Sequence, residues 1–192
     1  QAPHLADVMI GQRLTIEAWQ AYIQSYSWGE LRPTRLVLHH TAVPTIEQWA
    51  GLRSMQGMQR YYGGKGWTAA PHVYAAPDGI WLFTPMRDVG IHAGTGNSGG
   101  SGGTFWYSIG LDMVGDYDRA RPGGAVWENA KAVIGGLSRR LNTAPRQLIS
   151  FHRDYTNQKS CPGWAVTKDW VFGEIDAWLA NQAPPPPPPP RT

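Results

Sequence analysis

The stretch His152–Gly163 reads His-Arg-Asp-Tyr-Thr-Asn-Gln-Lys-Ser-Cys-Pro-Gly and contains Cys161, the one cysteine of the chain. It follows the apolar run 148–151, which predicts a short strand. A ligand at a strand end, followed by a second ligand in a loop, suits a metal ion, and Zn²⁺ accepts both imidazole and thiolate. Taken alone, the stretch is better explained as a loop with a structural histidine and an inert buried thiol.

A third candidate ligand stands much earlier in the chain. Residues 35–42 read Arg-Leu-Val-Leu-His-His-Thr-Ala, an apolar β-type run that ends in His39 and His40. Side chains alternate along a strand, so these two histidines point to opposite faces of the sheet. One of them can face a metal site while the other packs or meets solvent. A catalytic zinc needs three protein ligands and keeps a fourth position for water.

Five segments along the chain carry a resemblance to a known family. They are Leu-Val-Leu-His-His-Thr-Ala (36–42), Gly-Trp (66–67) with Ala-Pro-His-Val-Tyr (70–74), Ile-His-Ala-Gly (91–94), Ser-Ile-Gly-Leu-Asp (108–112), and His152 followed by Lys-Ser-Cys-Pro-Gly (159–163). In this order they resemble the zinc-dependent N-acetylmuramoyl-L-alanine amidases of the phage-lysozyme and peptidoglycan-recognition-protein type, over roughly residues 30–180. The order of all five segments, rather than any one of them, makes the likeness.

The resemblance implies a site for one zinc ion. It makes His39, His152 and Cys161 the ligands. His39 is preferred to His40 because in these amidases the histidine that directly ends the apolar run binds the metal. It also makes Lys159 the group that stabilises the developing oxyanion, although the loop from His152 to Lys159 is one residue longer than in the phage lysozyme.

Two residues compete for the proton transfer. Many family members have a tyrosine where this chain has His72, whereas the bacterial cytoplasmic muropeptide amidases have a histidine there and a glutamate at the position of Asp112. Asp112 interrupts an otherwise apolar predicted strand, where a carboxylate is costly unless it is paired or part of a site. Zinc would lower the pKa of its water to about 7 and polarise the amide carbonyl. Asp112 or His72 would then accept the water proton and return it to the leaving amine.

The bond that the resemblance implies is the amide between the lactyl group of N-acetylmuramic acid and L-alanine in peptidoglycan. His92, Trp67 and Thr41 would line the substrate groove, and for His92 a structural role is an equal alternative. A different class of function is a non-catalytic module of the same fold that recognises muropeptides. Such recognition proteins usually lack the cysteine ligand, so Cys161 and Lys159 favour a wall-lytic amidase of the endolysin or autolysin type.

Length and composition limit the other functions. A chain of 192 residues predicts one domain with a sizeable core. The formal net charge of +3 is mild and spread out, so it suits an anionic wall and gives no sign of nucleic-acid binding. One cysteine excludes an internal disulfide, no stretch is long enough for a membrane span, and no signal peptide is visible. We expect a monomer that acts on the cell wall as a periplasmic, secreted or phage-delivered protein.

The hydrophobic pattern predicts an α/β fold, with a central mixed β-sheet flanked by helices, which agrees with the amidase fold that the resemblance implies. Three parts are expected: an N-terminal helical extension packed on the domain (1–29), the catalytic domain (30–182), and a proline-rich linker or tail (183–192). The seven prolines at 184–190 favour an extended polyproline II segment that could lead to a wall-binding module.

The helices and strands follow from periodicity and turn residues. Thr45 and Gln48 form a capping-box pattern, which predicts that a helix begins at Thr45 and buries Ile46, Trp49, Leu52, Met55 and Tyr62. The expected elements are a helix over 15–26, a strand over 35–40, a helix over 45–62, strands over 70–76 and 80–84 joined by Pro77-Asp78-Gly79, a glycine-rich loop over 94–103, a strand over 107–114, a helix over 126–141, a strand over 148–151 and a helix over 166–179.

Overall fold

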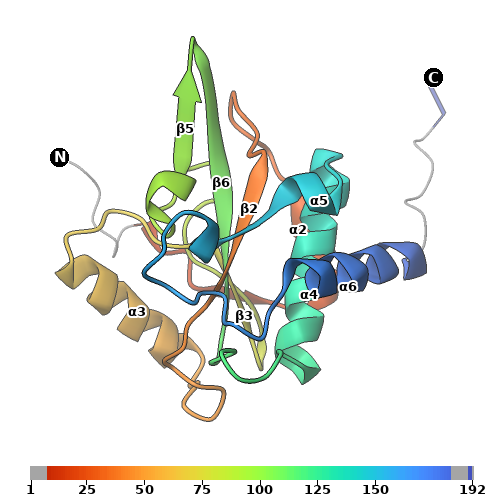
Figure 1. Cartoon of the computed structure of the whole chain (residues 1–192). Helices are drawn as coiled ribbons and strands as arrows, with labels where there is room; N and C mark the ends of the chain where they lie inside the picture. The colour runs from red at the N-terminus through yellow and green to blue at the C-terminus, as the bar shows by residue number, and fades with distance from the viewer. Residues whose placement is uncertain (1–7, 183–189, 192) are drawn as a thin grey trace.

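One mixed β-sheet runs through the middle of the molecule, and helices cover both of its faces (Figure 1). The computed structural model describes residues 8–182 and 190–191. The strand order is β1-β4-β3-β6-β2-β7, with β5 paired to β6 outside this path. The strands are β1 (Gln12–Leu14), β2 (Arg35–His40), β3 (Val73–Ala76), β4 (Gly79–Leu82), β5 (Ser98–Ser101), β6 (Thr104–Met113) and β7 (Ile149–Phe151). This architecture confirms the predicted fold class.

Parallel pairing in the centre of the sheet decides where the site lies. Strands β3, β6, β2 and β7 pair in parallel, so their carboxyl ends meet at one edge. The pairs β1–β4, β3–β4 and β5–β6 are antiparallel. The β3–β4 hairpin turns at the predicted Pro77-Asp78-Gly79.

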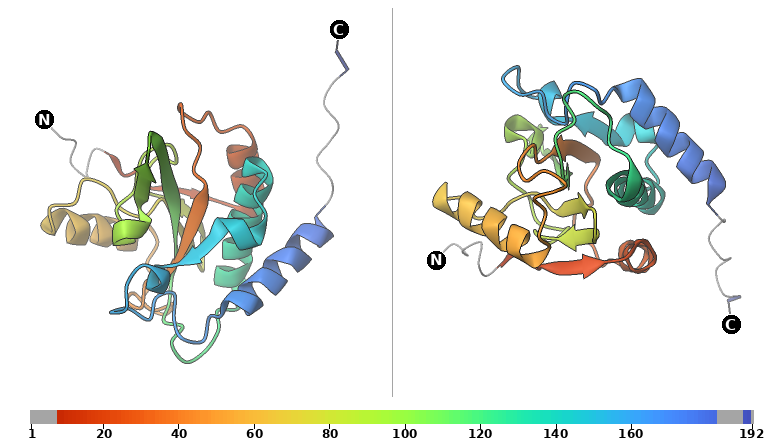
Figure 2. Two further views of the ribbon diagram at one scale, coloured as in Figure 1. Left: turned by 45° about the horizontal axis from the view of Figure 1, so that its top comes forward. Right: turned by 90° about the horizontal axis from the view of Figure 1, so that it is seen from below.

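Helices pack on the two faces of the sheet in unequal numbers. Helices α2, α4 and α6 lie on one face, and α3 lies on the other (Figure 2). The helices are α2 (Ile16–Gln24), α3 (Leu52–Gly64), α4 (Gly124–Leu141), α5 (Pro145–Leu148) and α6 (Lys168–Asn181), with short 3-10 turns η1 (Gly94–Gly96) and η2 (His152–Asp154).

Strand alternation divides the core into two clusters. In β3 and β4, Val73, Ala75, Ile80 and Leu82 face α4 in the main cluster, while Tyr74, Ala76 and Trp81 face α3 in a second cluster. The second cluster is completed from α3 by Met55 and Met58. The face of the sheet that α3 covers is therefore less deeply packed, and it is the face that carries the site.

The N-terminal helix is held firmly in the main cluster. Its N-cap is the predicted Thr15, whose hydroxyl accepts a hydrogen bond from the amide of Ala18. Trp19 and Ile23 are fully buried against α4, and the Trp19 indole donates to the Ala132 carbonyl at 3.0 Å. Burial of an Ile side chain contributes roughly 1.5–3 kcal/mol, so α2 shares the core of the sheet domain.

The helix predicted from Thr45 begins later than expected. Thr45 and Gln48 do exchange the capping-box hydrogen bonds, at 2.9 and 3.3 Å, but they close only an isolated turn. Gly51 then adopts a positive φ of 63°, and α3 begins at Leu52. Ile46 thus lies outside the helix and Leu52 at its first residue, and both are exposed instead of buried.

The predicted glycine-rich loop at 94–103 is in fact mostly a β-hairpin. Strand β5 pairs with β6, and the turn is Gly102-Gly103, with φ of 61° and 86°. Two consecutive positive φ values fit a two-residue hairpin turn that favours glycine. The indole of Trp106 packs so closely on Gly99 that a Cβ there would lie 2.8 Å from the ring. The hairpin projects beyond the body of the molecule (Figure 1).

The two ends of the chain are described only in part. Residues 12–14, just before Thr15, contribute β1 at the edge of the sheet. The proline-rich tail predicted over 183–192 lies outside the described residues, apart from residues 190 and 191. Within the part of the chain that is described, no helix is long and apolar enough to cross a bilayer.

Candidate metal centre

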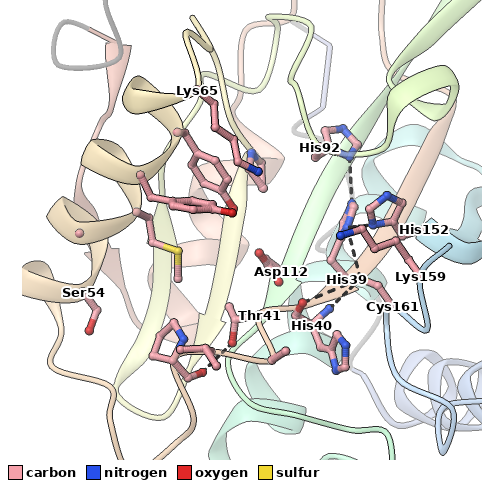
Figure 3. Close-up of a pocket in the computed structure, with 18 of the residues that line it drawn as sticks. His39, His40, Thr41, Ser54, Lys65, His92, Asp112, His152, Lys159 and Cys161 are labelled. Carbon is pink, nitrogen blue, oxygen red and sulfur yellow. Dashed lines mark hydrogen bonds between the residues drawn. The ribbon is translucent and has the colours of Figure 1, made fainter. Parts of the chain in front are cut away.

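The sheet brings His39 and Asp112 side by side. His39 in β2 pairs in register with Asp112 in β6, so both side chains leave the same face near the carboxyl ends of parallel strands. Their apolar neighbours Leu38 and Leu111 point the other way, into the main cluster. The alternation that buries the leucines therefore turns the two polar side chains toward α3 (Figure 3).

His152 and Cys161 reach the same place from the chain that follows β7. His152 opens η2 directly after the strand, and Cys161 lies on the loop that returns to it. Arg153 fixes this loop: its amide donates to the Cys161 carbonyl at 2.9 Å, and its guanidinium donates to the carbonyls of Ser160 and Gly163 at 3.0 and 2.7 Å. This role of Arg153 could not be predicted from the sequence, because the sequence does not reveal which carbonyls an arginine will bind.

The three predicted ligands converge on one point. Nδ1 of His39 lies 3.2 Å from Nδ1 of His152 and 3.5 Å from Sγ of Cys161, and all three ligand atoms lie within 4.8 Å of one another. Tetrahedral zinc with Zn–N of about 2.0–2.1 Å and Zn–S of about 2.3 Å requires separations of about 3.3 Å between nitrogens and about 3.6 Å between nitrogen and sulfur. The donor set and its spacing fit a zinc ion with one position left open.

The protonation states of the imidazoles also suit a metal. Burial, with the neighbouring histidines adding to it, lowers the pKa of His39 well below its usual value. Burial and the charge of Lys159 lower the pKa of His152 as well. Neutral imidazole is the form that ligates metals. Burial acts in the opposite direction on Cys161 and raises the pKa of its thiol, so a cation is needed to hold the thiolate there.

A second group of possible ligands, His40 with Asp116 and Asp118, does not make a comparable site. The amide of Tyr117 donates to Nδ1 of His40 at 3.0 Å, so in the neutral ring the proton sits on Nε2 and no lone pair faces the carboxylates. Asp118 is already used to accept from the Trp164 amide at 3.2 Å. His40 thus holds the loop that follows β6, on the side of β2 away from His39.

This difference predicts the outcome of substituting each histidine. We expect His40→Ala to keep stoichiometric zinc, measured by elemental analysis, with a modest loss of stability from the hydrogen bond to Tyr117, on the order of 1 kcal/mol. His39→Ala should lose the metal, because it removes the ligand that lies close to both His152 and Cys161. Zinc lost from His40→Ala and kept by His39→Ala would reverse the assignment.

Asp112 is a buried carboxyl with an unused oxygen. Its side chain is 5% exposed, and Oδ1 has no hydrogen-bond partner among the described residues. Burial raises its pKa from 3.8 to about 8. An unpaired carboxyl in an apolar strand is costly. A buried carboxyl with a raised pKa beside candidate metal ligands is typical of a functional residue.

Lys159 lies on the loop before Cys161 and lines the same groove. It is exposed, and none of the three ion pairs found among the described residues involves it. Its positive charge is felt at His152, whose pKa it helps to lower. Lys159 is thus an exposed residue of the groove close to His152 (Figure 3).

The structure does not bring His72 into the groove. The ring is fully buried, the Gly110 amide donates to its Nδ1 at 2.9 Å, and its Nε2 lies 2.7 Å from the Asp88 carbonyl. Both nitrogens are thus taken by backbone groups, and burial lowers the pKa of the ring to about 4. His72 joins β6 to the segment after β4, and these contacts favour Asp112 over His72 for the proton transfer.

The groove over the metal centre has a volume of about 950 Å³ and lies between β2, the Cys161 loop and α3. Trp67 forms part of its wall and stacks on Tyr62, with ring centroids 4.9 Å apart. Thr41 lines the groove too, but its hydroxyl is used within the fold, donating to Pro44 and accepting from Gly115. Tyr61 and Lys65 also line the groove and were not predicted, although their spacing from Met58 places all three on one side of the helix.

His92 lines the groove beside the candidate ligands but is almost entirely buried. It is 7% exposed, and its Nδ1 lies 3.0 Å from Nε2 of His39. Burial, with neighbouring His72 and His152 adding to it, lowers its pKa well below the usual value.

Residues 29–164 match the model of a protein family described as N-acetylmuramoyl-L-alanine amidase. No curated protein sequence matches the chain significantly. Among solved structures, Drosophila PGRP-LB is similar at 22% identity and a TM-score of 0.61, over 81% of this chain and 86% of that one. The endolysin amidase LysCS of Clostridium intestinale is similar at 22% identity and a TM-score of 0.57, over 82% and 93%.

A third similar structure is the Ph2119 endolysin from a Thermus scotoductus bacteriophage, at 22% identity and a TM-score of 0.55, over 78% of this chain and 89% of that one. These likenesses establish the fold. The matched family range begins after α2 and ends just beyond the loop of Cys161, so it contains every residue of the metal centre.

Proposed function

This chain belongs to the N-acetylmuramoyl-L-alanine amidase family, and from that premise we propose that it is a zinc-dependent hydrolase. The bond it cleaves is the amide between the lactyl group of N-acetylmuramic acid and L-alanine in peptidoglycan. Membership of the family supports the amidase activity, and the assignment of zinc and of individual residues is our proposal.

The observation that carries the proposal is the meeting of three ligands with a free carboxyl. His39, His152 and Cys161 surround one point, and Asp112 stands next to His39 with an oxygen that nothing in the described chain occupies. The groove above them has room for a peptide and a sugar ring. A purely structural metal site would use four protein ligands and would not need the buried acid.

Each residue then has a separate task. His39, His152 and Cys161 would hold the zinc, which when bound supplies Lewis acidity to polarise the amide carbonyl and to acidify a water molecule. Asp112 accepts a proton from the attacking water as the new carbon–oxygen bond forms. The Lys159 ammonium opposes the negative charge on the former carbonyl oxygen. As the carbon–nitrogen bond breaks, Asp112 returns its proton to the amine of L-alanine.

The pKa of Asp112 suits this exchange. A general acid–base group works best when its pKa lies near the working pH. Burial alone raises the pKa to about 8, and a cation nearby lowers it again, because it stabilises the carboxylate. Asp112 can therefore be ionised when water attacks and protonated when the amine leaves.

The non-catalytic alternative is supported by the likeness to peptidoglycan recognition proteins, such as the complex of the PGRP-LCa and PGRP-LCx ectodomains with tracheal cytotoxin bound. A module that only binds muropeptides would need neither Cys161 nor an unpaired buried acid. The presence of both favours hydrolysis. We place the activity at the cell wall, as an endolysin or autolysin, with the proline-rich tail as a tether to a wall-binding module.

The test is metal removal with the reaction products measured. The purified protein should contain one zinc per chain and should release L-alanine amino termini from purified cell walls, with a fall in turbidity and no new reducing sugar ends. Dialysis against a chelator should abolish this release, and zinc should restore it. Wall binding without release in the zinc-loaded protein would favour the recognition module, and full release by metal-free protein would refute zinc dependence.

A further inference from the structure

A row of hydrogen bonds leads from the backbone to Nε2 of His39, the ring nitrogen that does not face His152 and Cys161. Nε2 of His39 lies 3.0 Å from Nδ1 of His92, and Nε2 of His92 lies 3.4 Å from Oγ of Ser108. The Ser108 hydroxyl then donates to the Gly96 carbonyl at 2.6 Å. Ser108 belongs to β6 and Gly96 to η1, so the row is anchored in the fold at its far end.

The far end of the row sets the direction of every bond in it. A carbonyl can only accept, so the hydroxyl hydrogen of Ser108 points to Gly96 and leaves its oxygen to accept from Nε2–H of His92. A neutral ring with its proton on Nε2 has a bare lone pair on Nδ1, which accepts from Nε2–H of His39. His39 is left with an unprotonated Nδ1, the atom that faces His152 and Cys161.

The backbone is built to hold the His92 ring in this place. A Cβ on Gly110 would lie 2.6 Å from the ring, and a Cβ on Gly90 would lie 3.0 Å from it. The amides of His92 and Ala93 both donate to the side-chain carbonyl of Asn97, at 2.9 and 2.6 Å. The ring is thus held by close contacts with two glycines and by the hydrogen bonds of its backbone.

We infer that His92 is a positioning residue that fixes the tautomer and orientation of His39 for metal binding. The inference rests on the proposed zinc site and deepens it. This role is an alternative to the expected contact with substrate: His92 lines the groove, but both of its ring nitrogens point at protein groups and the residue is 7% exposed. Partners of this kind raise the basicity of the ligand and hold its ring in place.

The experiment compares two replacements of nearly the same shape. Asn places a carbonyl oxygen where Nδ1 of His92 stands and can still accept from His39, whereas Leu cannot accept. The dissociation constant for Zn²⁺, measured by competition with a chromophoric chelator, should rise about 10- to 100-fold in His92→Leu and should stay close to the parent value in His92→Asn. Circular dichroism at the start confirms that both variants are folded.

A second measurement reads the tautomer itself. In metal-free protein, ¹⁵N chemical shifts should show His39 protonated at Nε2 in the parent and in His92→Asn, and mixed in His92→Leu. Equal zinc affinity in the Leu and Asn variants would overturn the inference. A rise in KM in His92→Leu with its zinc affinity unchanged would also overturn it, because it would show that His92 contacts the substrate. A parent protein that binds no zinc would instead overturn the proposed function.

Discussion

Replacing Cys161 by Ser will remove stoichiometric zinc and, with it, the release of L-alanine termini from cell walls. The reason is that a serine hydroxyl does not ionise near neutral pH and offers no thiolate to the metal. The side chain is 8% exposed and Ser is close to it in size, so the fold around it should remain. Loss of the several kcal/mol that a Lewis acid supplies corresponds to roughly a thousandfold fall in rate or more.

Elemental analysis and the wall assay, run on the same preparation, check this result. His40→Ala is the matched control, because His40 lies beside a ligand and holds a loop through Tyr117 without facing the metal. A Cys161→Ser protein that keeps one zinc per chain and the parent rate would show that sulfur is not a ligand.

Asp112→Asn should still bind zinc but should hydrolyse the substrate much more slowly. Asn has the size of Asp but cannot accept and return a proton, so kcat should fall by about a hundred- to ten-thousandfold, the usual contribution of general acid–base catalysis. The low-pH limb of the rate profile should change too. Lys159→Ala should also slow the reaction but leave that limb in place, because the ammonium acts as a fixed charge. A near-parent rate in Asp112→Asn would move the proton transfer to another group.

Asp112→Asn should also make the metal-free protein more stable above pH 4. The carboxyl has a pKa near 3.9 when unfolded and about 8 when folded. Between these values the folded state holds a proton that the unfolded state lacks, so stability falls as pH rises, by about 1.4 kcal/mol per unit. Asn removes this dependence. Denaturant unfolding in the presence of a chelator at pH 5 and pH 8 should show the gap between variant and parent widening with pH.

The part of the site that was predictable lies on regular strands. Alternation along 35–40 predicts that His39 and His40 face opposite sides of the sheet. In the structure His39 faces His152, whereas His40 accepts from the Tyr117 amide. The polar Asp112 within an apolar strand likewise predicts a special position. Strand period is a local property, so it can be read from neighbouring residues alone.

Contacts between distant segments could not be read in this way. His72 and His92 both follow apolar or glycine-rich stretches, and only the fold decides that one is bound by the backbone on both sides while the other meets His39. The hairpin of β5 was hidden because glycine lacks strand propensity; packing of Trp106 on Gly99 outweighs that weakness. The start of α3 depended on one backbone angle at Gly51 that a capping-box pattern does not reveal.

The division of the core into two clusters affects which residues of the groove can change during evolution. The metal ligands are attached to strands and loops around the main cluster, whereas the wall formed by α3 rests on the second, smaller cluster through Met55 and Met58. Exposed wall residues such as Tyr61 and Lys65 contact neither cluster deeply. Under the proposed function, such residues can be exchanged without moving the candidate reacting groups, so substrate range and catalytic power could change independently in evolution.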